Sequence, residues 1–190
     1  SGSDSAIAPC PAPSINYAVL DIETRRSAEE VGGWHKADKM GVSCCVLYDS
    51  KADIFKNYFQ DDMAALCRDL QSFDLIIGFN IIRFDYKVLS GLTNFDFSSL
   101  PTLDILQKIH KTLGYRLSLD KLASETLECS KSANGLLALQ WWKQGKIDKI
   151  VEYCKQDVKV TRDLYLYGKI NKFLLFQNKA GLTVRVPVDF

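Results

Sequence analysis

Residues 17–24 read YAVLDIET, an apolar run typical of a buried strand that ends by carrying two carboxylates. Side chains alternate between the two faces of a strand, so Val19, Asp21 and Glu23 share one face. Strands disfavour Asp, and burying an unpaired carboxylate is costly. Two neighbouring acids also repel each other, so the pattern predicts that something positive lies between Asp21 and Glu23.

A second acid interrupts an apolar helix face in GFNIIRFDYKVL, residues 78–89. We expect Asn80 to cap a helix that runs to Gly91, which places Asp85 in the apolar stripe of that helix. The helix N-terminus favours a negative charge by only about 0.3–1 kcal/mol, which is too little to offset full burial. Asp85 is therefore a further acid that faces inward.

A third segment, IVEYCKQDVKVTRDLY at residues 150–165, again places an acid among apolar neighbours. Tyr153 and Asp157 are four residues apart and stack on one helical face. Any one of these acids could simply be salt-bridged or capping. Together, however, four inward-facing acids from three elements predict one shared site, and such oxygen ligands suit Mg²⁺ or Mn²⁺. Two such ions about 3.5–4 Å apart form a recurring device for phosphodiester cleavage.

The three motifs resemble a known family. Asp-x-Glu on the first strand, Asn-x3-Phe-Asp in the middle and Tyr-x3-Asp on a late helix are similar to the exonuclease motifs of the DEDD superfamily. The tyrosine resembles that of the DEDDy branch, which includes the proofreading domains of family A and B DNA polymerases. The flanking LPTLDIL, SLDKLASETL and YCKQDVKVTRDLY are most similar to bacterial stand-alone or helicase-associated members. The resemblance covers residues 17–167.

The resemblance implies a ribonuclease H-like α/β fold, with a central mixed sheet of about five strands flanked by α-helices. It implies a metal-dependent 3′–5′ exonuclease that hydrolyses DNA, or RNA, from the 3′ end and releases nucleoside 5′-monophosphates. The family's four acids, which would hold two divalent cations (Mg²⁺ or Mn²⁺), map onto Asp21, Glu23, Asp85 and Asp157, and its tyrosine maps onto Tyr153.

By similarity, each residue of this set has a role. Asp21 would bridge both ions. Glu23 and Asp157 would complete the shell of the first ion, and Asp85 would hold the second. The first ion would make a hydroxide-like water available, and the second would stabilise the leaving 3′ oxygen. Because an ordinary tyrosine has a pKa near 10, Tyr153 is expected to orient that water rather than to remove its proton.

Several residues are candidates for contact with the substrate, and each also has a structural alternative. Asn80 either contacts the substrate or only caps its helix, and Thr24 either contacts the terminal nucleotide or serves a turn. Residues 25–40 are expected to form a long loop that contacts the substrate or is disordered. Trp141 and Trp142 could stack on bases, but adjacent helical positions point in different directions, so at least one is expected in the core.

Other polar residues are given structural roles. Asp104 and Asp120 lie in family-like sequence outside the four-acid set, and we expect them to cap helices or to form structural pairs. Five lysines of the late helices either flank a phosphate path or form a solvated helix face: Lys143, Lys146, Lys149, Lys155 and Lys159.

The composition is that of an ordinary globular protein, with 190 residues, 47% hydrophobic, 25% charged and a net charge of +1. This balance argues against nucleic-acid binding that depends on overall positive charge, but it is compatible with bound metal ions that contact the phosphates. No apolar run approaches the roughly 18 residues needed to span a bilayer, so no membrane association is expected. We expect a flexible leader over residues 1–14 and a single exonuclease-like domain over 15–190.

The six cysteines form no CxxC pair, and neither histidine has a zinc-finger spacing from two of them. This pattern argues against a zinc site or a disulfide framework, and a reducing cytoplasm is the expected location. We expect each cysteine to behave as a small buried hydrophobe.

The expected elements begin with strands and continue with helices. After the first strand come two strands joined by a turn near Asp49-Ser50, a helix over 61–70, a short strand over 75–80, and a strand near 101 that leads into a short helix. Short helices are expected over 117–127 and 133–142, then a long helical segment over 147–178 with a break at Gly168. The final VRVPVDF is either a strand or a tail.

Two alternatives to the exonuclease stay open. One is a nucleic-acid-binding module that assists a helicase or polymerase without cutting, against which the intact five-residue set argues. The other is a purely structural α/β domain, against which the inward placement of the acids argues. The expected partner is a nucleic acid with a 3′ end, single-stranded DNA being favoured, in DNA repair or proofreading with a helicase or polymerase. The residues do not separate DNA from RNA, because the metals act on the phosphodiester that both share.

Overall fold

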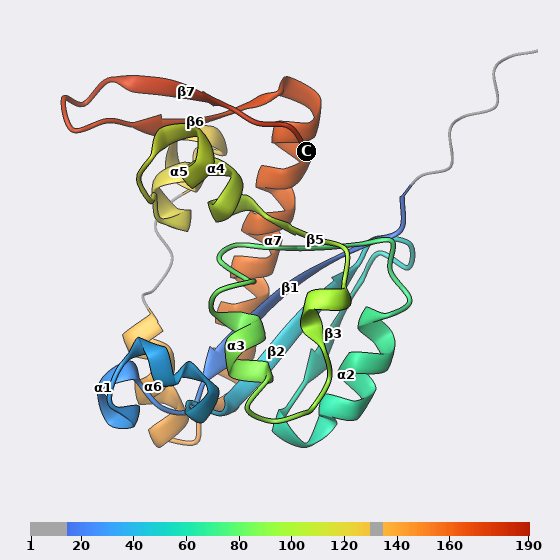
Figure 1. Cartoon of the computed structure of the whole chain (residues 1–190). Helices are drawn as coiled ribbons and strands as arrows, with labels where there is room; N and C mark the ends of the chain where they lie inside the picture. The colour runs from blue at the N-terminus through green and yellow to red at the C-terminus, as the bar shows by residue number, and fades with distance from the viewer. Residues whose placement is uncertain (1–14, 130–134) are drawn as a thin grey trace, which may run out of the picture.

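The computed structural model describes residues 15–129 and 135–190, so the leader predicted over 1–14 lies outside the described residues. A five-stranded mixed sheet forms its centre (Figure 1). Its strands, in the spatial order β3-β2-β1-β4-β5, are β1 (Tyr17–Thr24), β2 (Val42–Asp49), β3 (Ile54–Tyr58), β4 (Leu75–Gly78) and β5 (Thr102–Asp104). β1–β2 and β2–β3 pair antiparallel, whereas β1–β4 and β4–β5 pair parallel. The predicted mixed sheet of about five strands is confirmed.

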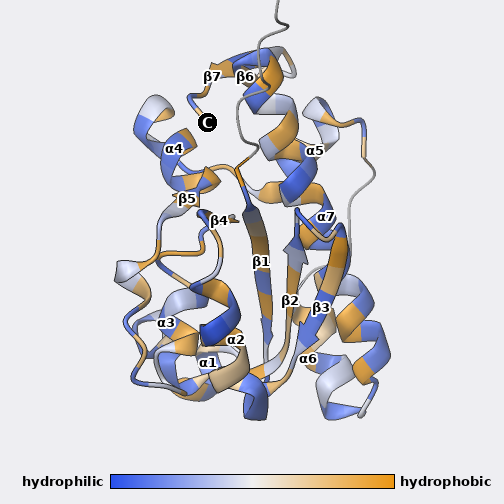
Figure 2. Ribbon diagram, turned by 90° about the vertical axis from the view of Figure 1, so that its right-hand side faces the viewer, coloured by the Kyte–Doolittle hydropathy of each residue, from blue (hydrophilic) through white to orange (hydrophobic). Residues whose placement is uncertain are grey.

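The two faces of β1 bury different sets of residues, as its alternating pattern predicts. Val19 packs into the core beneath α7 (Ile147–Asn171), and Leu20 and Ile22 pack into the core on the opposite face. That opposite face is covered by α2 (Met63–Leu70) and α3 (Asp85–Leu89). Figure 2 shows apolar residues, in orange, along β1 and β2. The face that carries Asp21 and Glu23 is therefore the one that α7 crosses.

The remaining helices are short. They are α1 (Ala28–Val31), η1 (Trp34–Lys39), η2 (Gln60–Asp62), η3 (Phe97–Ser99), α4 (Ile105–Leu113), α5 (Leu119–Thr126) and α6 (Gly135–Lys143). The helices predicted over 61–70 and 117–127 and after residue 101 are confirmed; of the helix predicted over 133–142, residues 133 and 134 lie outside the described residues. None of the described helices is both long enough and apolar enough to cross a membrane.

The long loop predicted over residues 25–40 is wrong, because this segment folds into α1 and η1. The Ser27 hydroxyl accepts from the Glu30 amide at 3.1 Å, and the Glu30 carboxylate accepts from the Ser27 amide at 2.7 Å. This reciprocal capping box was legible in the sequence as Ser-x-x-Glu. The segment also packs closely on the chain after α3: a Cβ added at Gly91 would lie 1.8 Å from the carbonyl oxygen of Asp38.

The long helical segment predicted over residues 147–178 is wrong at its end. α7 continues through Gly168 without a break and stops at Asn171, after which Lys172 adopts a left-handed φ of 65°. A hairpin of β6 (Phe173–Gln177) and β7 (Thr183–Pro187) follows and lies across α4 and α5 (Figure 1). The hairpin forms because its alternate side chains, such as Phe176, are buried in the core beneath α7.

The five cysteines among the described residues are free thiols. Four of them are buried and Cys129 is half-buried, while Cys10 lies outside the described residues (Cys44, Cys45, Cys67 and Cys154 are the buried ones). They pack as small apolar side chains in the two cores.

Candidate metal centre and cleft

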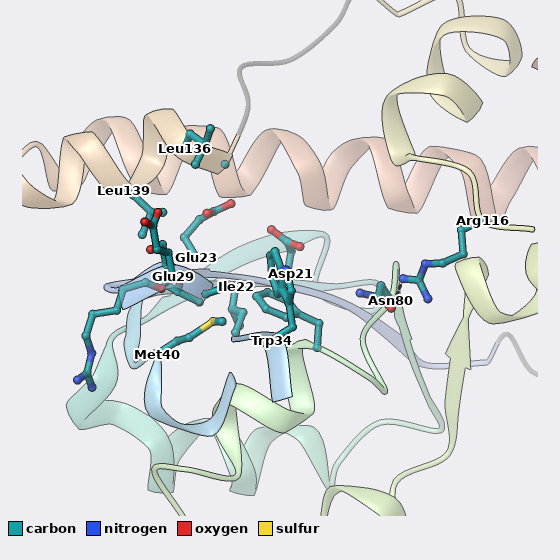
Figure 3. A pocket seen from close by; sticks show the side chains of 16 residues that line it. Asp21, Ile22, Glu23, Glu29, Trp34, Met40, Asn80, Arg116, Leu136 and Leu139 are labelled. Carbon is teal, nitrogen blue, oxygen red and sulfur yellow. Dashed lines mark hydrogen bonds between the residues drawn. The ribbon is translucent and has the colours of Figure 1, made fainter. Parts of the chain in front are cut away.

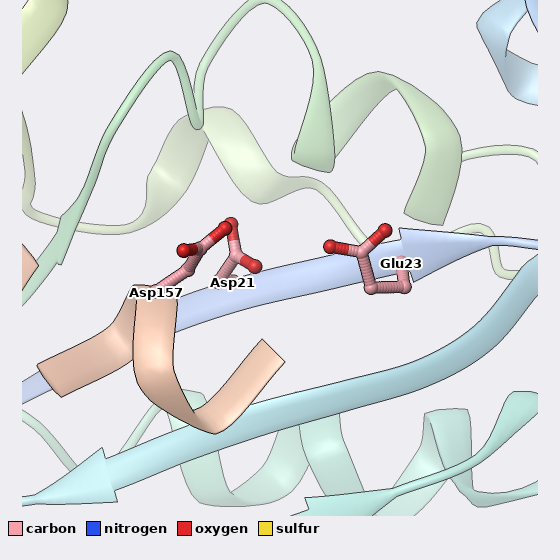
Figure 4. Close-up of side chains that lie close together, drawn as sticks. All are labelled: Asp21, Glu23 and Asp157. Atoms are coloured by element: carbon pink, nitrogen blue, oxygen red, sulfur yellow. The ribbon is translucent and has the colours of Figure 1, made fainter. Parts of the chain in front are cut away.

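The end of β1 and the middle of α7 bring three carboxylates together. Asp21, Glu23 and Asp157 each offer an oxygen atom, and these atoms lie within 4.8 Å of one another (Figure 4). Asp21 and Glu23 lie on the same side of β1, and Asp157 approaches from the helix that crosses that side. All three side chains are half-buried.

The spacing of this trio fits one hard divalent cation. Two oxygen ligands on opposite sides of Mg²⁺ lie about 4.2 Å apart, because each Mg–O distance is about 2.1 Å. The oxygens of the trio span little more than that distance. Carboxylates are also the ligand type that Mg²⁺ and Mn²⁺ favour. A divalent cation therefore fits the place where the sequence predicted a positive partner.

The ionised forms of the two acids of β1 are electrostatically unfavourable without a compensating positive charge. Burial raises the pKa of Asp21 well above its usual range, and the charges of Asp85, Asp157 and Glu23 raise it further. Burial, followed by the charge of Asp157, does the same to the pKa of Glu23. Both acids tend to keep a proton unless a cation compensates the charge.

Tyr153 lies one helical turn from Asp157, as predicted, and its phenol is close enough to the carboxylate to lower the pKa of Asp157. Burial and then the charge of Asp120 raise the pKa of Asp157 to about 7, while the phenol opposes the shift. Burial and the charge of Asp157 raise the pKa of Tyr153, so its phenol stays protonated near neutral pH. The Trp141 ring lies edge-on to the Tyr153 ring, with centroids 6.3 Å apart. Asp120, which sequence reasoning placed outside the site, is thus close enough to influence it.

Asp85 lies beside the trio but is not a member of it. It is the first residue of α3, its side chain is buried, and its Oδ1 accepts from the Ile22 amide of β1 at 3.2 Å. Burial raises the pKa of Asp85 to about 8, and the charge of Asp104 adds to the shift. Among its charged neighbours, Asp85 contributes most to the raised pKa of Asp21. The structure therefore brings three of the four predicted acids together and places the fourth next to them.

The predicted helix cap at Asn80 is wrong. α3 begins five residues later, at Asp85, and Asn80 adopts a left-handed φ of 61° in the preceding turn. Its amide donates to Asp104 Oδ1 at 2.9 Å, and its side-chain Oδ1 accepts from Arg116 Nη2 at 2.9 Å. Asn tolerates this backbone region, which a turn requires here and a helix cap does not.

Asp104 has the capping role expected of it and a second role. Its carboxylate accepts from the Gln107 amide at 3.2 Å and so caps α4. It also accepts from the amides of Asn80 and Ile82, at 2.9 and 3.2 Å. Asp104 therefore fixes the turn that delivers Asp85 to the site. Asp120, in contrast, does not cap α5, whose N-cap is Ser118.

A cavity of about 930 Å³ opens over the acids (Figure 3). Asp21 and Glu23 line it together with Thr24 and Asn80, the two residues predicted to contact the substrate. The Thr24 hydroxyl is already engaged with the Arg26 carbonyl, to which it donates at 3.0 Å. Thr24 thus serves a turn, and a contact from it to the substrate stays a prediction.

The exposed aromatic side chain at this cavity is Trp34, from the segment expected to be a loop. Its indole is 71% exposed, and it lies edge-on to Phe84 with centroids 5.9 Å apart. Trp141 and Trp142 do not line the cavity, but pack half-buried against the core. The core interpretation of that pair is therefore the better one, and the guanidinium of Arg25 lies 4.6 Å from the Trp142 ring.

The late-helix lysines behave as a helix face and line neither described cavity. Lys143 pairs with Glu30 at 2.9 Å, Lys149 lies over Trp141, and Lys155 and Lys159 lie over Phe55. The basic residues that do line the cavity are Arg26 and Arg116, and sequence reasoning missed Arg116. Its partner Asn80 is 36 residues away, so no local pattern could have indicated it.

Comparison with known proteins agrees with this fold. A family model described as RNase_H superfamily matches residues 18–167. The chain belongs to the RNase H superfamily. Its fold is RNase H-like, with the five-stranded mixed sheet flanked by helices. The match ends within α7, so the β6–β7 hairpin of this RNase H superfamily member lies beyond it.

Among solved structures, the chain is similar to the family B DNA polymerase from the hyperthermophilic archaeon Pyrobaculum calidifontis. The TM-score is 0.62 at 14% identity, and the likeness covers 84% of this chain and 24% of the polymerase. The chain thus spans about a quarter of that protein, and at this identity the likeness shows the fold alone. A search of curated proteins found no match.

Proposed function

We propose that this RNase H superfamily member is a metal-dependent 3′–5′ exonuclease of the DEDDy type. The observation that carries the proposal is the trio of Asp21, Glu23 and Asp157, whose oxygens lie within 4.8 Å of one another beside a cavity of about 930 Å³. Half-buried, mutually repelling acids next to an open cavity are better explained by a cation site than by packing.

The proposed division of roles follows from the positions of the side chains. Asp21, Glu23 and Asp157 would hold one divalent cation, and Asp85, beside Asp21, is proposed to serve a second. Such ions, Mg²⁺ or Mn²⁺, would supply a water of lowered pKa and stabilise the leaving 3′ oxygen. Tyr153, whose phenol keeps its proton, is suited to orient that water by a hydrogen bond rather than to act as a base.

The proposed substrate is a nucleic-acid strand with a free 3′ end, with single-stranded DNA as the first candidate. The cavity has the size of a small-molecule site, which suits a terminal nucleotide better than an intact duplex. Thr24 and Asn80 on its wall are proposed to contact that nucleotide. The likeness to a family B DNA polymerase supports proofreading or repair, with a helicase or polymerase as partner, as the proposed context.

The test is an incubation of single-stranded oligonucleotides labelled at the 3′ or the 5′ end with Mg²⁺ or Mn²⁺. We expect labelled mononucleotide from the 3′ label and a ladder of shortening products from the 5′ label. Asp21→Asn and Asp157→Asn should each abolish the products, because each removes a cation ligand while keeping the side-chain shape. Asp61→Asn, at an exposed acid of η2, is the matched control and should leave the products unchanged.

Two outcomes would overturn the proposal. Products that persist unchanged in Asp21→Asn and Asp157→Asn would exclude these acids from the reaction. Metal-dependent binding of the oligonucleotide without any product would favour the non-cutting module that assists a helicase or polymerase. An Mn²⁺ soak of crystals adds an independent readout, since the trio should give a strong peak even without substrate.

A further inference from the structure

A second, smaller cavity of about 680 Å³ lies between the start of α5 and the β6–β7 hairpin. Three cationic side chains and one exposed aromatic side chain line it: Arg116, Lys121, Lys179 and Tyr115. Among the residues that the structure describes, no acidic side chain lines this groove. The chain as a whole carries a net charge of only +1, so the groove is a local concentration of positive charge.

The groove adjoins the cavity over the acids, because Arg116 lines both. Its guanidinium donates to Asn80 Oδ1 on the wall of the first cavity, at 2.9 Å. Figure 3 places Arg116 and Asn80 at one end of the first cavity and Leu139 at the other, with Asp21 between them. A linear polymer that lies in the first cavity and extends past the acids toward Arg116 would therefore enter the second groove.

The walls of the groove are already held in place in the free protein. Phe176 is buried in the core, and the Tyr115 ring lies edge-on to it with centroids 6.4 Å apart. At the tip of the hairpin, Asn178 Oδ1 accepts from the amides of Ala180 and Leu182, at 2.9 and 3.0 Å. Binding would thus require little ordering of this part of the chain.

We infer that this second groove binds single-stranded nucleic acid. Lysine and arginine side chains pair with phosphates, and an exposed aromatic ring stacks on unpaired bases. Tyr115 is 50% exposed although its ring contacts Phe176, so about half of the side chain is accessible to a base. The bases of a duplex are paired and stacked already, which is why a single strand fits this combination.

The inference deepens the proposed function, because it assigns this groove to the strand upstream of the scissile phosphate. A released terminal nucleotide is short and has no need of a second cavity. Only the upstream part of the strand is long enough to reach from the acids past Arg116 to Lys121 and Lys179. The hairpin wall lies beyond residues 18–167, so it is a feature of this chain and not of the family match.

The test compares substrates of different length. We would measure kcat/KM for oligothymidylates of about three and about twelve nucleotides, the longer within the range that single-strand sites cover. The p-nitrophenyl ester of thymidine 5′-monophosphate reports on the acids alone. The test variant is Lys121→Ala/Lys179→Ala, and its matched control is Lys51→Ala/Lys87→Ala, at exposed lysines that line neither cavity.

We expect the test variant to keep ester and short-strand activity within about twofold while kcat/KM on the longer strand falls about tenfold. Anisotropy of the labelled longer strand should show that the slope of log affinity against log salt flattens by about 0.7 for each lysine removed. The control should match the wild type in every assay. Tyr115→Ala should also weaken longer-strand binding, but with an unchanged salt slope.

Several results would overturn the inference. One is an unchanged length dependence in the test variant. Another is loss of ester hydrolysis, since the lysines would then act through the acids. A third is equal wild-type affinity for an acidic peptide of matched charge, which would make the groove a protein-binding site. If the wild type cleaves nothing, the proposed function fails, but anisotropy still tests the groove: equal strand binding by both variants would reject it.

Discussion

The thiol of Cys154 on α7 donates to two oxygen atoms of Asp21 on β1, the backbone carbonyl at 3.3 Å and carboxylate Oδ2 at 3.4 Å. Cys154 is fully buried, whereas Asp21 is half-buried at the wall of the cavity. The hydrogen bond to the side chain lowers the pKa of Asp21, against the upward effect of burial. Cys154 thus ties the helix that carries Asp157 to the strand that carries Asp21, and it orients the Asp21 carboxylate.

Cys154→Ala should weaken cation binding more than it weakens the fold. Losing the hydrogen bond frees the Asp21 carboxylate and raises its pKa further, so we expect Mn²⁺ affinity to fall about threefold to tenfold. Isothermal titration with Mn²⁺ measures this. Cys67→Ala removes a buried thiol from α2, on the other face of the sheet, and should leave Mn²⁺ affinity unchanged. Equal loss in both variants would show that packing, not the thiol bond, is responsible.

Without divalent cations, the protein should lose stability as the pH rises from about 5 to about 8. Asp157 keeps its proton up to a pKa of about 7 in the fold, compared with a usual value of 3.8, and the pKa of Asp85 is raised to about 8. A pKa raised by folding stabilises the fold at low pH, and that contribution is lost as the pH passes through the raised value. Thermal unfolding in EDTA measures the trend.

Two comparisons make this pH prediction specific. Asp157→Asn should flatten part of the decline, because an amide does not titrate. Saturating Mg²⁺ or Mn²⁺ should remove most of the decline, because the cation compensates the charges that appear as the acids ionise. A midpoint in EDTA that rises over this pH range would contradict the raised pKa values.

Asp104→Asn should destabilise the protein and lower activity together. Its two carboxylate oxygens accept from the amides of Asn80 and Ile82, and one of them also accepts from Gln107. An amide side chain offers one acceptor oxygen, so at least one part-buried N–H loses its partner, and we expect a cost of about 1 kcal/mol. Urea unfolding checks the stability, and the oligonucleotide assay checks whether the turn before Asp85 has moved.

The matched control for Asp104 is Asp96→Asn. Asp96 also caps a helix, η3, but its bonds to Ser98 are exposed and do not involve the turn before Asp85. Asp96→Asn should lower the free energy of unfolding by about 1 kcal/mol or less and leave activity unchanged. Equal activity in Asp104→Asn and the wild type would show that the turn does not depend on Asp104.

Trp34→Ala should lower activity on oligonucleotides without lowering stability. The indole is 71% exposed, so its removal leaves no internal cavity. The free energy of unfolding should therefore change by less than about 0.5 kcal/mol. If the ring stacks on the terminal base, kcat/KM should fall about tenfold, and Trp34→Phe should restore part of it. Ile170→Ala, at a 79% exposed side chain of α7, is the control and should leave both quantities unchanged.

Local pattern was enough for much of the site. Two-residue alternation placed Asp21 and Glu23 on one face of β1, and four-residue spacing placed Tyr153 next to Asp157. These periodicities are properties of the backbone and hold whatever the element packs against. The same reasoning failed at Asn80, because a left-handed turn held by Asp104, 24 residues away, precedes the helix.

The errors at the edges of the fold have a similar cause. The capping box at Ser27 and Glu30 was legible in the sequence, but the fold of residues 25–40 also depends on how closely Asp38 approaches Gly91. The alternating residues after Asn171 form a hairpin because Phe176 and its neighbours find a core to enter. A short apolar run is compatible with helix or strand until burial selects one.

The sequence by itself determined the set of candidate site residues and which face of its element each one occupies. Only the tertiary structure decided that Asp85 stands beside the trio rather than within it, because its Oδ1 is engaged by the Ile22 amide of a strand 63 residues away. Likewise, only the packing of α5 against the hairpin placed Arg116 between the two cavities. The physical reason is common to both. The periodicity of a helix or strand fixes which way its side chains point, whereas packing in the shared core fixes the distance between two elements.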